Sequence, residues 1–139
     1  MSMISHHAAL IYAMIVGSAA DGDISEEEIN SIGEMMTVLP IFADFERSKF
    51  AEVAGACNEL LTNEEGIEAA IGMIKESLPD KLCQTAYALA CDVVAADGIA
   101  TQEELRYLEM LRHGLNVDRL TAAAIERGSA ARYARLPRE

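Results

Sequence analysis

Two short acidic segments hold the residues of this chain that are best suited to bind a cation. Residues 20–29 read Ala-Asp-Gly-Asp-Ile-Ser-Glu-Glu-Glu-Ile, and residues 96–105 read Ala-Asp-Gly-Ile-Ala-Thr-Gln-Glu-Glu-Leu, so the two align without gaps. Carboxylates are hard oxygen ligands, which suit Ca²⁺, Mg²⁺ or Mn²⁺ better than Zn²⁺. The second segment is the weaker one because Ile99 stands where the first has an acid. If the segments face each other, five carboxylates can surround one divalent cation: Asp21, Asp23, Glu28, Asp97 and Glu104.

The same segments also have a purely structural interpretation. An Asp-Gly step permits a sharp chain reversal, and Ser or Thr followed three residues later by Glu forms a capping box at the start of a helix. Neither segment alone makes an EF-hand, because Gly17 and Ala19, and then Val93 and Ala95, occupy positions where that loop needs oxygen ligands. Turns with capped helices therefore remain the alternative to a cation site.

Helices must position both segments. Apolar residues recur at helical spacing, and short segments with helix-capping or helix-ending residues separate the apolar runs. This pattern predicts helices over about 5–19, 25–39, 45–61, 63–78, 80–96 and 101–115, with a seventh capped by Asp118. The fourth is expected to be capped at Thr62 and Asn63. No alternating strand pattern competes with this assignment. The predicted fold class is all-α, a single-domain bundle of about seven helices built around a duplicated helix-loop-helix.

The expected domain covers residues 1–139. Its repeat units span about 5–39 and 81–115, and residues 116–139 form the C-terminal helix and an Arg-rich tail. The helix expected at 80–96 is apolar almost all round, and a helix without a polar face is usually central. The corresponding helix of the first unit, at 5–19, is also apolar. We therefore expect residues 5–19 and 80–96 to lie in the middle of the bundle.

Charge is distributed unevenly along the chain. The 139 residues include 23 acids and 11 bases, for a net charge of −12, yet residues 112–139 are basic on balance. An acidic surplus argues against binding to nucleic acid phosphates and to anionic membranes. The expected partners are proteins, with the Arg-rich end docking an acidic neighbour or a second copy to form a homodimer. A solvated last helix that ends near Pro137 is the alternative.

Few residues point to catalysis. The chain has no nucleophile elbow, Gly-rich phosphate loop or HExxH motif, and His113 stands alone. We therefore expect no enzymatic activity and no catalytic or cofactor-binding residue other than the cation ligands, although an acid–base enzyme with paired carboxylates stays a third possibility. Apolar surroundings predict buried free thiols at Cys57, Cys83 and Cys91. They likewise predict core positions for several methionines, namely Met35, Met36, Met73 and Met110.

The expected location is the cytoplasm. No apolar run is long enough to span a bilayer. The apolar stretch at residues 8–16 has no Lys or Arg before it, unlike a secretion signal.

The paired Ala-Asp-Gly-x-x-Ser/Thr-x-x-Glu segments, each between two helices, resemble those of the TerB family of tellurite-resistance-associated proteins. The resemblance covers roughly residues 8–117. It implies a compact bundle of about seven helices that acts in bacterial stress response. It also implies an acidic metal site, which maps onto Asp21, Glu28, Asp97 and Glu104. The family's domains also occur in proteins unrelated to tellurite, so the phenotype does not follow from the fold.

Overall fold

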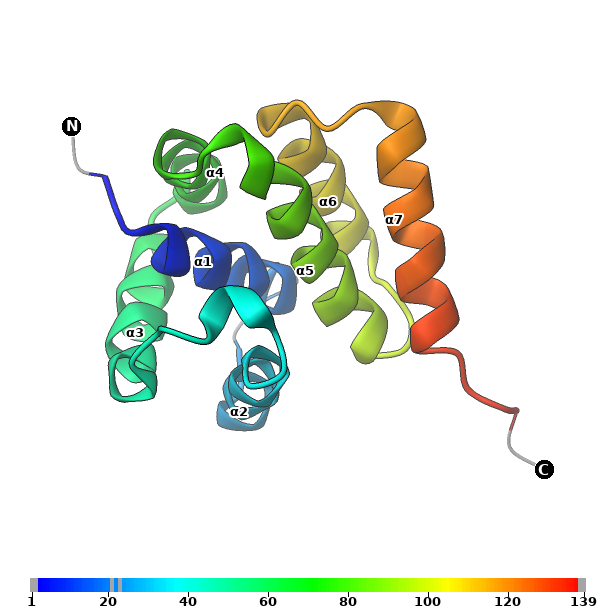
Figure 1. Cartoon of the computed structure of the whole chain (residues 1–139), viewed down its shortest axis with the longest axis horizontal. Helices are drawn as coiled ribbons and strands as arrows, with labels where there is room; N and C mark the ends of the chain where they lie inside the picture. Colours follow the sequence, from blue (N-terminus) through cyan, green and yellow to red (C-terminus); the bar gives the residue numbers. More distant parts are fainter. Residues whose placement is uncertain (1–2, 21, 23, 138–139) are drawn as a thin grey trace.

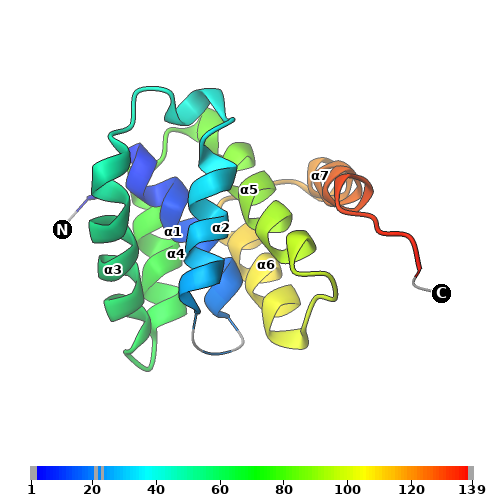
Figure 2. The same cartoon turned by 90° about the horizontal axis from the view of Figure 1, so that it is seen from below.

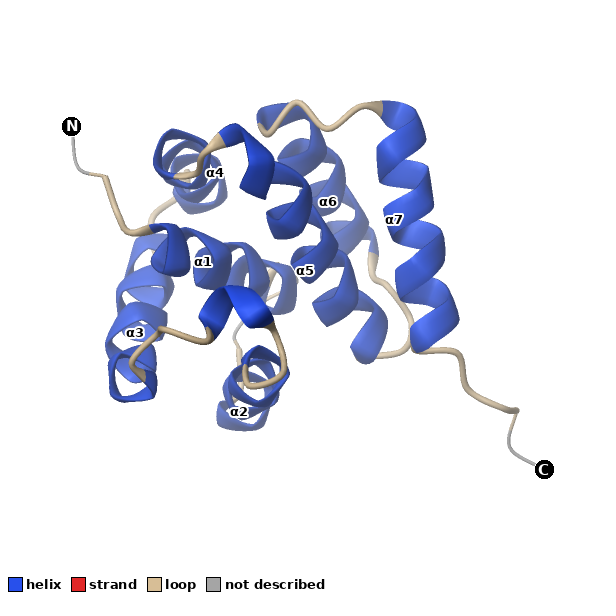
Figure 3. Cartoon of the chain, viewed as in Figure 1, coloured by secondary structure: helices blue, strands red, loops and turns tan. Residues whose placement is uncertain are grey.

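The computed structural model describes residues 3–20, 22 and 24–137, and helices make up all of the regular structure in these ranges (Figures 1 and 3). The α-helices are α1 (His6–Ala19), α2 (Glu26–Met36), α3 (Phe50–Leu61), α4 (Gly66–Ser77), α5 (Cys83–Ala96), α6 (Gln102–Gly114) and α7 (Arg119–Arg132). Three short 3₁₀ turns are η1 (Pro40–Phe42), η2 (Arg47–Lys49) and η3 (Asp80–Leu82). The predicted all-α fold with seven helices is confirmed. None of the helices in the described ranges combines the length and apolar content needed to cross a bilayer.

Helix α1 runs through the middle of the bundle. Its residues from His7 to Ser18 are all buried, and it packs against α5, α4 and α3 (Figure 1). Helix α5 is also apolar on most of its surface, and α7 covers its outer side, across the bundle from α3. The central position predicted for these two helices is confirmed for the described residues. Their apolar surfaces are explained by packing against several helices: α1 against α3, α4 and α5, and α5 against α1, α6 and α7.

Helix α6 is tied to α1 by a buried hydrogen bond. The hydroxyl of Tyr107, whose side chain is only 1% exposed, donates to the carbonyl oxygen of Ala13 at 2.8 Å. Burial raises the pKa of this phenol well above its ordinary value, so the hydroxyl keeps its proton and remains a donor. The bond satisfies a polar group that would otherwise be costly to bury.

Three predicted helix caps are present. Ser25 with Glu28, and Thr101 with Glu104, each form a complete capping box. At the start of α7, the backbone N–H and the hydroxyl of Thr121 both donate to Asp118, and these bonds lower the pKa of that carboxyl. Helices α2, α6 and α7 therefore begin where the sequence predicts.

The predicted cap at Thr62 and Asn63 is wrong. Helix α4 begins three residues later, at Gly66, after Glu65, whose side chain makes no capping bond. Thr62 instead terminates α3, where its hydroxyl donates to the carbonyl of Glu59 at 2.7 Å. Gly66 lies so close to the end of α3 that a Cβ there would come within 2.6 Å of the Leu60 carbonyl.

The start predicted for the third helix is also too early. Residues 43–49 form turns, and α3 begins only at Phe50. Long-range contacts hold this connector: Arg47 donates to the carbonyl of Gly33 at 2.6 Å, and the His7 ring stacks on Phe42. Neither contact can be inferred from local sequence.

Tyr107→Phe tests the bond between α6 and α1. Removing the hydroxyl should lower the free energy of unfolding by about 1 kcal/mol, the usual net value of a buried hydrogen bond. Urea denaturation followed by circular dichroism measures the change. Tyr133→Phe, in a half-buried residue after α7, is the matched control and should cost less than about 0.5 kcal/mol. Equal losses in the two variants would contradict this role for Tyr107.

Candidate functional site

The two Asp-Gly segments belong to the same end of the bundle. Helices α1 and α5 end there, and α2 and α6 begin there (Figure 2). Gly22 and Gly98 have positive φ angles of 145° and 103°, which side chains other than glycine rarely allow. Gly22 and Gly98 thus have the backbone conformation that the predicted chain reversals need.

A small cavity at this end brings residues from both segments together. Its volume is about 210 Å³, and its walls come from the end of α1, the first turns of α2 and the end of α5. The oxygen-bearing residues among those lining it are Ser18, Ser25, Glu27, Glu28, Ser31 and Asp97. Of the five predicted ligands, Glu28 from the first segment and Asp97 from the second share this cavity.

Glu28 is held in place by hydrogen bonds. One carboxylate oxygen accepts the backbone N–H of Ser25 at 2.9 Å, and the other accepts the hydroxyl of Ser18 at 3.4 Å. Each carboxylate oxygen has more than one lone pair, so these bonds leave acceptor capacity on both oxygens. The side chain is therefore preorganised toward the cavity and can still coordinate a cation.

Glu104 has a different environment. Its side chain is 3% exposed, and one carboxylate oxygen accepts the backbone N–H of Thr101 at 2.8 Å. The described residues that line the cavity include Asp97 but not Glu104. Asp97 itself is exposed at the C-terminal end of α5. Within the described part of the chain, Glu104 thus acts as a helix cap, while Asp97 reaches the cavity.

Two of the predicted ligands, Asp21 and Asp23, lie outside the described residues. Among the residues that are described, no group of three or more His, Cys, Asp or Glu side chains is positioned to hold a metal ion. The donors that do line the cavity are carboxylate and hydroxyl oxygens, which is the ligand chemistry that Ca²⁺, Mg²⁺ and Mn²⁺ prefer. The chemistry fits a hard cation, with three carboxylates, those of Glu27, Glu28 and Asp97, among the described lining residues.

Ser18 and Ser31 were not predicted as part of this site. Ser31 follows Glu28 by three positions and so lies on the same face of α2. Ser18 is buried near the end of α1, where only the packing of α1 against α2 places it beside Glu28. The helical spacing between Glu28 and Ser31 could have identified Ser31 as a residue of the site. No feature of the sequence identifies Ser18.

The three cysteines are free thiols, and their environments disfavour reactivity. Burial raises the pKa of Cys57 and of Cys91 to about 12, which keeps both protonated near neutral pH. Cys83 is partly exposed, and its pKa is raised by burial and by the charge of Asp80. The predicted burial of thiols is confirmed for Cys57 and Cys91 and is only partial for Cys83.

The described structure defines a small all-α bundle with an acidic, capped turn region at one end. The family model described as tellurite resistance protein TerB matches residues 7–127, which is most of the chain. This protein therefore belongs to the TerB family of tellurite-resistance-associated proteins. No curated protein and no solved structure matches the chain.

Thiol labelling under native conditions tests the cysteine environments. Ellman's reagent at mildly alkaline pH should react first with Cys83, and with Cys57 and Cys91 more than about tenfold more slowly, because attack requires an accessible thiolate. Absorbance at the thionitrobenzoate band follows the reaction. Cys83→Ser should remove the fast phase, whereas Cys91→Ser should leave it intact. A fast phase that survives Cys83→Ser would contradict the assignment.

Proposed function

We propose that this TerB-family protein is a non-enzymatic binding protein that holds one divalent cation at its Asp-Gly turns. The observation that carries the proposal is the shared cavity, to which Glu28 and Asp97 contribute carboxylates from separate segments. Asp21 and Asp23, predicted as ligands from the sequence, would complete an oxygen-only set. Glu104, the fifth predicted residue, would support the site by fixing the start of α6.

Helix electrostatics support a cation on the α5 side of the cavity. The C-terminal end of a helix carries a partial negative charge, and Ala96 and Asp97 at the end of α5 line the cavity. The N-terminal end of α2 has the opposite partial charge, which Glu26, Glu27 and Glu28 in its first turn offset. A cation would therefore lie nearest the end of α5 and the carboxylate of Glu28.

A second candidate function is a protein-interaction module without a metal. The observation that favours it is that Glu28 and Glu104 both already serve as helix caps. On this alternative the Asp-Gly turns only reverse the chain, and function resides on an outer surface. The two candidates make opposite predictions for divalent cations.

Isothermal titration calorimetry of chelator-treated protein with CaCl₂, MgCl₂ and MnCl₂ separates the two candidates. The cation proposal predicts one binding site, and its affinity for the cation should fall at least about tenfold in Asp97→Asn, which corresponds to about 1.4 kcal/mol. Glu28→Gln should lower the cation affinity similarly. Because glutamine can still complete a capping box, this loss of affinity reports on coordination of the cation rather than on the helix cap.

Glu103→Gln is the matched control for these variants. It removes one negative charge from the first turn of α6 at an exposed residue outside the cavity lining. Its cation affinity should stay within about twofold of the wild type. Absence of binding heat with all three cations, or unchanged affinity in both Asp97→Asn and Glu28→Gln, would overturn the cation proposal and favour the interaction module.

A further inference from the structure

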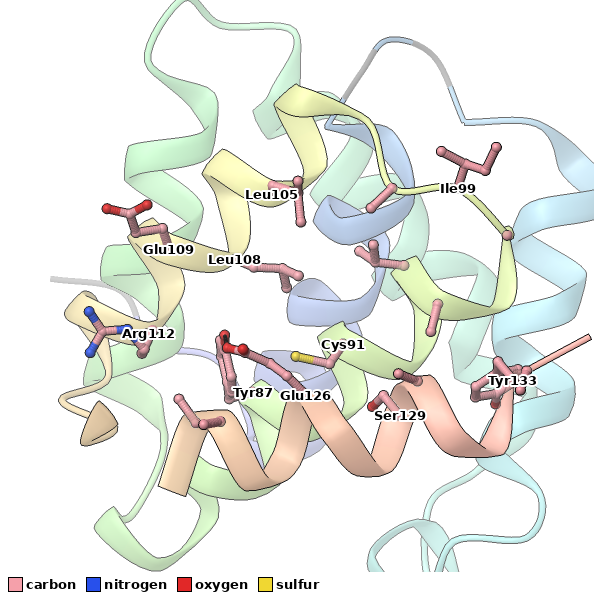
Figure 4. Close-up of a pocket in the computed structure, with 18 of the residues that line it drawn as sticks. Tyr87, Cys91, Ile99, Leu105, Leu108, Glu109, Arg112, Glu126, Ser129 and Tyr133 are labelled. Atoms are coloured by element: carbon pink, nitrogen blue, oxygen red, sulfur yellow. Dashed lines mark hydrogen bonds between the residues drawn. The ribbon is translucent and has the colours of Figure 1, made fainter. Parts of the chain in front are cut away.

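A larger groove lies on the other side of α5 from α1. Helix α7 packs against α5, and between α7 and α6 there remains an open groove of about 1090 Å³ with α5 as its floor (Figure 4). The connector between α6 and α7 lies at one end of the groove, and the turn between α5 and α6 lies at the other. The groove includes neither Glu28 nor Asp97.

The lining of the groove is apolar in its middle. Leu105 of α6 is 54% exposed there, although it lies on the same helical stripe as the buried Leu108. Ile99, at the turn end, is 90% exposed. The opposite wall on α7 consists mainly of small residues, which leaves space between the helices: Ala122, Ala123, Ser129 and Ala130. Exposed leucine and isoleucine beside an alanine-rich wall are typical of a surface that another apolar group covers.

Arginines stand at both ends of the groove. Arg112 donates to the carbonyl of Val117 in the connector at 3.2 Å, and Arg119 is the exposed first residue of α7 beside it. At the far end, Arg135 donates to the carbonyl of Ala96 at 2.8 Å. All three line the groove, and an arginine has five N–H donors, so donors remain for a ligand.

Two glutamates also line the groove. Glu126 accepts the hydroxyl of Tyr87 at 2.6 Å, and burial together with this bond raises the pKa of the phenol. Glu109 lies on α6. The groove therefore has three arginines against two acids, in a chain whose net charge is −12. Its charge is opposite in sign to that of the molecule as a whole.

We propose that this groove binds an amphipathic helix of a partner protein, with the apolar stripe of that helix on Leu105 and Ile99 and its acidic residues paired with the arginines. Two parallel walls with an apolar floor match the helix-in-groove mode of recognition, in which residues at i, i+3, i+4 and i+7 enter the groove. Helix α7, which forms one wall, has 14 residues and is about 21 Å long. Arginines at both ends suit a ligand that extends along such a length.

The charges disfavour the other occupants. A second copy seated symmetrically on this face would set groove against groove, so the arginines at the ends of one groove would face the arginines at the ends of the other. A small amphiphile with one anionic head would use the arginines at one end only, and an open groove would leave much of it in water.

The proposal specifies the partner of an interaction module, yet it does not depend on the cation site. Cation binding is tested at Glu28 and Asp97, whereas groove binding is tested at residues of α6 and α7. Failure of one experiment therefore leaves the outcome of the other intact.

A displayed library of helical peptides tests the proposal without a known partner. Peptides of about 14 residues, the length of α7, carry a fixed leucine stripe, and the flanking positions are randomised among Glu, Gln and Lys. Selection on the full-length protein should enrich Glu at the flanks. The affinities of the enriched peptides are then measured by fluorescence anisotropy at low and high salt, and they should fall as salt rises.

Paired variants locate the binding surface. Leu105→Glu and Arg119→Glu should each weaken the selected peptides about tenfold or more. Leu120→Glu and Arg127→Glu are matched controls, because these exposed α7 residues lie outside the groove lining, and they should stay within about twofold. Arg119→Glu should also bind Lys-flanked peptides better than the wild type does, a gain that a misfolded protein cannot show.

Any of the following results would overturn the proposal. Enrichment of Lys, absence of enrichment, or equal losses in the groove and control variants would contradict a groove selective for acidic helices. A dimer in analytical ultracentrifugation that Leu105→Glu abolishes would assign the groove to a second copy. Sedimentation with phosphatidylglycerol vesicles that Leu105→Glu abolishes would assign it to lipid.

Discussion

The packing of α1 against α5 is the constraint on which the rest of the molecule depends. Leu10, Ile11, Met14 and Ile15 of α1 are fully buried, and burial of each such side chain contributes on the order of 1.5–3 kcal/mol. Each helix is followed by a glycine with a positive φ angle, and Ser18 of one and Ala96 of the other line the same cavity. Apolar burial in the centre therefore determines where the acidic turns meet. The carboxylates are placed together by hydrophobic packing, against their mutual repulsion.

Features set by neighbouring residues were predictable from the sequence, and features set by distant contacts were not. The capping boxes at Ser25 and Thr101 involve residues three positions apart, so their pattern identifies them directly. The predicted cap at Thr62 is wrong because a hydroxyl can start one helix or, as here, terminate the preceding one, and the local sequence does not decide between the two. Sequence spacing identified Glu28 and Asp97 as candidates. Their shared cavity, and the serine that holds Glu28, depend on how three helices pack.

The groove illustrates the same limit. Leu105 and Leu108 form an apolar stripe on α6 that is typical of a core face, and the buried Leu108 fits that pattern. The exposure of Leu105 arises because α7 packs on α5 and leaves space beside α6. The net charge likewise does not indicate how charge is distributed over the surface. Acids surround one end of the bundle, whereas arginines from α6, α7 and the segment after α7 line the groove, so the chain presents two surfaces of opposite electrostatic character.

The turn between α5 and α6 contributes to both of these surfaces. Asp97 lines the acidic cavity, and the next three residues, Gly98, Ile99 and Ala100, line the groove. A positive φ angle at Gly98 gives this short piece of backbone a defined shape. A change in the backbone at this turn would therefore move lining residues of both surfaces together.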